Sequence, residues 1–86
     1  MHDILLAKEI FDAVAKCAKQ NRLKKVARIK IGLGRIEDHH EIIRPADLRF
    51  NFRILAGKNP AIRGAKVVIR KIRGPRWLLE EIEGEC

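Results

Sequence analysis

Residues 26–34 read Val-Ala-Arg-Ile-Lys-Ile-Gly-Leu-Gly, an alternation of apolar and charged side chains that is typical of a β-strand. The side chains expected on its inner face are Ala27, Ile29, Ile31 and Leu33. Arg28 and Lys30 fall on the outer face. Gly32 and Gly34 mark the end of the strand or a close approach of another backbone segment. The stretch therefore predicts a half-buried strand.

A helix precedes this strand, and a helix and a further strand follow it. From residue 4 to residue 19 apolar side chains recur at helical spacing. This stripe consists of Leu6, Ile10, Val14 and Cys17, widened by Phe11 and Ala13. A second helix begins at Pro45, a favoured first-turn residue, and runs through Leu48, Phe52 and Leu55. A second strand covers residues 65–72, and residues 76–82 fit either a third strand or a short helix.

Together these elements predict an α+β fold, a small two-layer domain in which two helices pack on a three-stranded sheet. Asp3 is expected to cap the first helix and Asn21 to end it. Residues 35–44 read as a polar loop. Gly57 is expected to close the second helix in left-handed geometry, and Cys17 to be a plain core residue.

Length and composition limit the class of protein. The 86 residues suffice for one domain with a single core. No apolar run is long enough for a membrane span and no signal-peptide pattern opens the chain, so a soluble protein is expected. Two cysteines without a CxxC pair indicate no disulfide framework and favour the reducing cytoplasm. Few amides and many Lys, Arg and Glu residues fit a thermophilic source.

The chain contains no Ser, Thr or Tyr. Hydroxyl nucleophiles and tyrosine acids are therefore absent, and nucleophilic catalysis would fall on cysteine. Because Cys17 lies within an apolar helix pattern, acyl transfer is not expected. The sequence indicates a binding protein rather than an enzyme.

The first three residues, Met1-His2-Asp3, suggest a metal site. The α-amine, the amide nitrogen of His2 and its imidazole can close consecutive chelate rings around one metal ion. With the amide deprotonated, this near-planar nitrogen set suits nickel(II) or copper(II) better than zinc. Because histidine is bulky, the initiator methionine is expected to stay in place. The alternative is that His2 stands there by chance and Asp3 acts only as a helix cap.

Two adjacent histidines, His39 and His40, lie between Asp38 and Glu41. In a flexible loop they are candidate additional nickel ligands or a relay for the metal. The alternative is a solvated polar loop whose two imidazoles point in opposite directions. His2 is the better supported ligand, because its chelate needs no tertiary contact.

Four segments in order carry a family resemblance. They are Met1-His2-Asp3, the strand of residues 26–34, the helix Pro45-Ala46-Asp47-Leu48-Arg49-Phe50-Asn51-Phe52, and the strand Ile62-Arg63-Gly64-Ala65-Lys66-Val67-Val68-Ile69. This order resembles the HypA/HybF family of nickel metallochaperones over about residues 1 to 72. Family members begin Met-His-Glu, have a Pro-x-x-Leu-x-Phe-x-Phe helix and follow it with a strand that opens with a small residue, Gly and Ala.

The resemblance implies a role in hydrogenase maturation. Family members receive nickel, often together with the GTPase HypB, and pass it to the precursor of the large subunit of a nickel–iron hydrogenase; some also support urease. Their nickel site, which comprises the amine, the following amides and the second-position histidine, maps onto Met1, His2 and Asp3.

The chain departs from the family pattern in three places. Asp3 replaces the usual Glu, and the loop before the second helix is longer and carries His39 and His40. The zinc domain, built from two CxxC pairs, is absent or truncated, which leaves residues 1–86 as a single nickel-binding domain without a complete zinc site. Cys86 is a remnant of that domain, the point where a longer chain was cut, or part of a zinc-less relative.

The basic segment of residues 42–79 suggests a second possible function. Net charge is +8, and from Ile42 to Leu79 the only acid is Asp47, set against ten Lys and Arg residues. Residues Arg63, Lys66, Arg70 and Arg73 are candidates for docking an acidic protein partner. The alternative to the metallochaperone is a small nucleic-acid-binding module that uses the face from Arg63 to Trp77, although no RNP, KH or recognition-helix signature is present.

Overall fold

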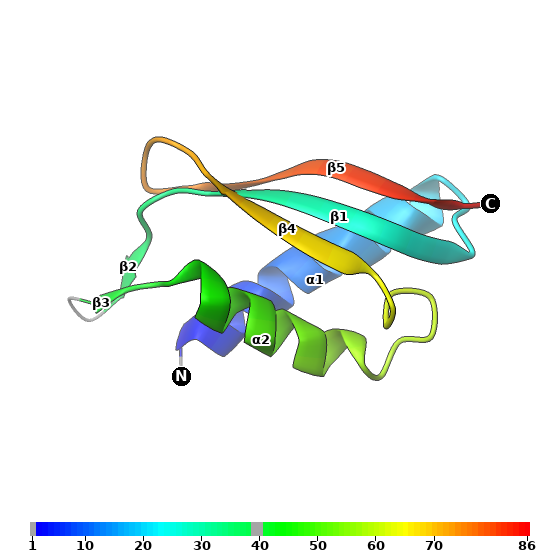
Figure 1. Ribbon diagram of the computed structural model, residues 1–86, viewed down its shortest axis with the longest axis horizontal. Coiled ribbons are helices and arrows are strands. Elements are labelled where there is room, and N and C mark those ends of the chain that lie inside the picture. Colours follow the sequence, from blue (N-terminus) through cyan, green and yellow to red (C-terminus); the bar gives the residue numbers. More distant parts are fainter. Residues whose placement is uncertain (1, 39–40) are drawn as a thin grey trace.

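The computed structural model describes the backbone of residues 2–38 and 41–86 and the side chains of residues 4–37 and 42–86. The elements are α1 (His2–Gln20), β1 (Lys25–Leu33), β2 (Glu37–Asp38), β3 (Glu41–Ile42), α2 (Pro45–Ala56), β4 (Lys66–Lys71) and β5 (Trp77–Glu85). Figure 1 shows the three long strands as one layer and the two helices as the other. The predicted α+β architecture of two helices on a three-stranded sheet is confirmed.

The sheet has the order β4-β1-β5, with β1 parallel to β4 and antiparallel to β5. Of residues 76–82, which fitted a strand or a helix, residues 77–82 belong to strand β5, which pairs with β1 along its length. The core lies between the sheet and the helices. Its largest fully buried side chains are Phe52, Ile10, Ile29, Ile31, Leu48, Ile62, Val14 and Val26. None of the described helices is long and apolar enough to cross a membrane.

Two burial predictions need correction. Ala27 is exposed and Val26 is buried, because a register shift against β5 between residues 26 and 28 interrupts the alternation of β1. Cys17 is half-buried, and the neighbouring Ala18 occupies the core position. The remaining inner-face residues of β1 are buried as predicted.

The ends of the helices also differ from expectation. Asp3 lies inside α1, which begins at His2, whereas a cap residue has non-helical backbone geometry. At its other end α1 stops before Asn21, as predicted, and Arg22 takes the left-handed conformation (φ 57°). Gly57 is not left-handed: its φ is −57°, and the chain continues through further right-handed turns. The polar loop of residues 35–44 contains a short hairpin, since β2 pairs with β3.

Candidate functional sites

The predicted metal site lies at the start of α1. Backbone N–H groups in the first turn of an α-helix have no partner within the helix. The amide nitrogens of His2 and Asp3 therefore stand outside the helical hydrogen-bond ladder. Met1 and the side chains of His2 and Asp3 lie outside the described part of the chain.

His39 and His40 also lie outside the described residues. The hairpin that frames them is described: β2 and β3 pair through Glu37 and Ile42, and the Ile43 amide donates to the Ile36 carbonyl oxygen at 3.0 Å. Within the described residues, no three His, Cys, Asp or Glu side chains are grouped to hold a metal ion. A ligand role for His39 and His40 stays a prediction.

The four candidate docking residues do not form one continuous patch. Arg63 and Lys66 lie at the start of β4, whereas Arg70 and Arg73 lie at its end. Lys66 and Arg70 share one face of the sheet, but four residues of strand separate them by about 13 Å. The predicted basic segment is therefore two separate groups of cations.

Arg70 forms an ion pair with Glu80 that spans the central strand. The Arg70 Nε donates to Glu80 Oε1 at 3.1 Å and Nη2 donates to Oε2. Because β1 lies between β4 and β5, the two side chains meet above Gly32, where a Cβ would lie 3.3 Å from Glu80 Cδ. The hydrogen bond from Arg70, followed by the Arg70 charge, lowers the pKa of the Glu80 carboxyl.

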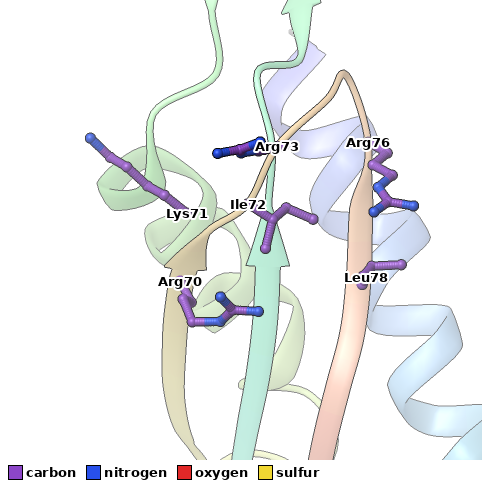
Figure 2. A pocket seen from close by; sticks show the side chains of 6 residues that line it. All are labelled: Arg70, Lys71, Ile72, Arg73, Arg76 and Leu78. Carbon is purple, nitrogen blue, oxygen red and sulfur yellow. The ribbon is translucent and has the colours of Figure 1, made fainter.

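Beside this ion pair, the ends of β4 and β5 enclose a shallow hollow of about 560 Å³. It is lined by Arg70, Lys71, Ile72, Arg73, Arg76 and Leu78, and we call it the tip hollow (Figure 2). Two of these residues, Ile72 and Leu78, are apolar, and Leu78 is 41% exposed. Figure 2 shows the Arg70 side chain extending from β4 towards β1 and the guanidinium groups of Arg73 and Arg76 on either side of the β4–β5 turn.

Gly34 fixes the turn that carries the tip hollow. Its amide donates to the Arg76 carbonyl oxygen at 2.7 Å, and the Arg35 amide donates to the Gly74 carbonyl oxygen at 2.9 Å. A Cβ on Gly34 would lie 1.9 Å from that Gly74 oxygen, so only glycine fits. The expected close approach of backbone at Gly34 is confirmed.

The structure gives the nucleic-acid alternative no support. Trp77 pairs with Leu33 and packs, half-buried, against the core cluster. Its ring is therefore not free to stack on a base, and Leu78 is the residue that faces outward beside the cations. Sequence reasoning placed Lys71 and Arg76 in the basic face from Arg63 to Trp77 but missed Leu78, because the period-two pattern around Trp77 did not decide between strand and helix.

The comparisons with known proteins agree with the fold. A family model described as hydrogenase/urease nickel incorporation, metallochaperone, hypA, matches residues 1–77. The solution structure of the nickel metallochaperone HypA from Helicobacter pylori superposes with a TM-score of 0.68 at 14% identity. The superposition covers 81% of this chain and 56% of that one, so this chain spans about half of that protein's length. Among curated proteins, no match is found.

Proposed function

The chain belongs to the HypA family, and on this basis we propose that it carries nickel(II) for the maturation of nickel–iron hydrogenase, with urease as a second acceptor. The observation that supports this most directly is the family match from residue 1 to residue 77, which includes Met1-His2-Asp3. The family consists of metallochaperones, so the proposed activity is capture and release of nickel without turnover.

The proposed nickel ligands are the Met1 amine, the His2 amide nitrogen and the His2 imidazole, with Asp3 beside them. The helix leaves the first-turn amides without backbone partners, which favours their use as metal ligands. Amine and amide must both lose protons on binding, so nickel affinity is expected to rise with pH. An unperturbed α-amine has a pKa of about 7.7–8.0, which places part of this rise between pH 7 and 9.

The proposed partners are the GTPase HypB and the precursor of the hydrogenase large subunit, as in the family. Both cysteines are free thiols in the structure, Cys17 half-buried and Cys86 exposed. Free thiols suit a reducing compartment, and the cytoplasm is the proposed location.

Nickel(II) titration by calorimetry and absorbance at pH 7.5 tests the site. The wild type is expected to show the weak d–d band of a planar nitrogen site, and His2→Ala is expected to lose both band and binding. The double variant His39→Ala, His40→Ala is the matched control: unchanged affinity there excludes the additional ligands but leaves the main site in place. Equal binding by wild type and His2→Ala, or an affinity that is flat from pH 6 to 9, would show that the proposed site is wrong.

A further inference from the structure

We propose that the tip hollow binds an acidic peptide segment of a partner protein, one in which carboxylates flank an apolar side chain. The hollow joins the cations Arg73 and Arg76 of the β4–β5 turn to two apolar side chains, Ile72 and Leu78, and Lys71 at the end of β4 also lines it (Figure 2). The cations alone would bind any acidic segment, and Ile72 and Leu78 alone would bind any apolar side chain. Together they favour a segment that carries both.

Within the described residues, most cations of the hollow have no ion-pair partner. Among the described residues, no acid forms an ion pair with Lys71, Arg73 or Arg76. Arg73 and Arg76 are exposed and flank the turn, so their guanidinium groups are accessible to carboxylates from outside. Guanidinium groups bind carboxylates through two parallel hydrogen bonds, which gives geometric selectivity as well as charge attraction.

The chain itself places one carboxylate, that of Glu80, next to Arg70 at the edge of the hollow. Glu80 accepts two hydrogen bonds from Arg70, through Nε and Nη2. This pair holds the Arg70 side chain across β1, uses two of its five N–H donors and offsets its charge, so the incoming carboxylates bind mainly to the remaining cations. Arg70 therefore shapes the wall and is not the principal contact.

The floor of the hollow favours a peptide over a nucleic acid. Ile72 and Leu78 offer apolar surface of the size of an aliphatic side chain, and Leu78 is 41% exposed. A single-stranded nucleic acid would need an aromatic platform for its bases, and Trp77 packs against the core instead. The occupant is therefore a polypeptide segment.

The hollow lies at the same end of the molecule as the first turn of α1 (Figure 1). A partner held there stands at the end that carries the proposed nickel ligands, so the hollow would dock a donor or acceptor of the metal. This last step rests on the proposed function, whereas peptide binding itself does not.

Fluorescence anisotropy with a labelled pentapeptide, Glu-Glu-Leu-Glu-Glu, on the full chain tests the proposal without nickel. The double variant Arg73→Glu, Arg76→Glu is expected to weaken binding by about tenfold or more. The matched control is Arg63→Glu, Lys66→Glu, which makes the same change in net charge with exposed residues at the far end of β4. This control is expected to weaken binding by about twofold. Circular dichroism checks that both variants are folded.

Two further probes complete the test. Gln-Gln-Leu-Gln-Gln and Glu-Glu-Gly-Glu-Glu are each expected to bind more weakly than the leucine-containing acidic peptide, because one lacks the charges and the other lacks the apolar contact. An equal loss of peptide affinity in the two double variants would show that binding depends only on net charge, and it would overturn the proposal. Tighter binding of a single-stranded oligothymidylate than of the peptide would also overturn it. Nickel affinity is measured separately through His2→Ala, so either proposal can fail alone.

Discussion

The first turn of α1 and the tip hollow share one end of the molecule, but they depend on the fold to different degrees (Figure 1). The proposed nickel ligands are consecutive along the chain, so they can close chelate rings whether or not the core is packed. The tip hollow consists of residues from two strand ends and their turn, joined to β1 by the contacts of Gly34. A site of the first kind can be read from the sequence, and a site of the second kind exists only in the folded chain.

Loss of core packing should produce the largest difference between the two sites, because it should lower the affinity for the peptide and not that for nickel. Ile31 is fully buried between the sheet and the helices, and Ile31→Ala is expected to lower the free energy of unfolding by about 2–5 kcal/mol. Small domains have little stability to spare, so the folded fraction and the affinity for the acidic peptide should fall together. Nickel affinity is expected to change little, because the proposed ligands are consecutive along the chain. Urea denaturation with both titrations measures this.

The control for that variant is Leu5→Ala, because Leu5 is 64% exposed. It is expected to change the free energy of unfolding by less than about 0.5 kcal/mol. A parallel loss of nickel and peptide affinity in Ile31→Ala would show that the nickel site also depends on packing, and the contrast between the two sites would disappear.

Blocking the amine of Met1 should weaken nickel binding and leave peptide binding at the tip hollow unchanged. Acetylation of the α-amine removes one proposed ligand and is expected to lower nickel affinity roughly a hundredfold, about 2.7 kcal/mol. Peptide binding at the tip hollow should not change, because the amine is not one of its lining residues. Calorimetry on acetylated and unmodified protein measures both affinities, and retained nickel binding would exclude the amine as a ligand.

A methyl group on Gly34 should disturb the tip hollow but not the proposed nickel site. Its Cβ would lie 1.9 Å from the Gly74 carbonyl oxygen, so the β4–β5 turn must move. Gly34→Ala is expected to lower the free energy of unfolding by about 1–3 kcal/mol and to weaken peptide binding. Gly64→Ala is the matched control, since no atom lies within 4 Å of the added Cβ. If the two alanine variants bind the peptide equally, the turn does not position the site.

The smallest predicted effect is a difference in pH dependence. The pKa of Glu80 is lowered in the folded state, chiefly by its hydrogen bond from Arg70. Its stabilisation is therefore complete above the carboxyl's ordinary pKa, near 4.5, and is lost as pH falls through the lowered value. From pH 6 to 9 this contribution should be flat, whereas nickel affinity should rise.

Thermal denaturation between pH 3 and 7, on the wild type and on Glu80→Gln, measures the effect of this carboxyl. The variant should lose part of the acid-dependent decrease in melting temperature, and identical curves would show that the ion pair adds no stability. The size of the effect is limited by solvent, since the Arg70 side chain is 55% exposed.

Much of the fold was predictable because its periodic patterns are strong. Both helices and the strands β1 and β4 lie within two residues of their predicted bounds, and the second helix begins at Pro45 as expected. The predicted thermophilic source and the ligand roles of Met1, His2 and Asp3 stay predictions. The metal site could be proposed from sequence because chelation by adjacent residues is a local property.

The remaining features depend on contacts between distant segments. The register shift that buries Val26 and exposes Ala27 arises from pairing with β5, which the pattern of β1 alone does not contain. The basic residues looked like one surface because they were counted along the chain, but the length of β4 separates Arg63 from Arg73. Arg73, Arg76 and Leu78 are near neighbours along the chain, but the pairing of β4 and β5 with β1 sets how they line one hollow.

The ion pair between Arg70 and Glu80 also affects how the sheet opens. It connects the two outer strands, which have no backbone pairing with each other, across the central strand. When either outer strand detaches from β1, it breaks this link to the opposite edge as well. We therefore expect transient opening of β4 and β5 to be coupled, so that amide hydrogen exchange at the two edges shows shared protection, which Glu80→Gln weakens.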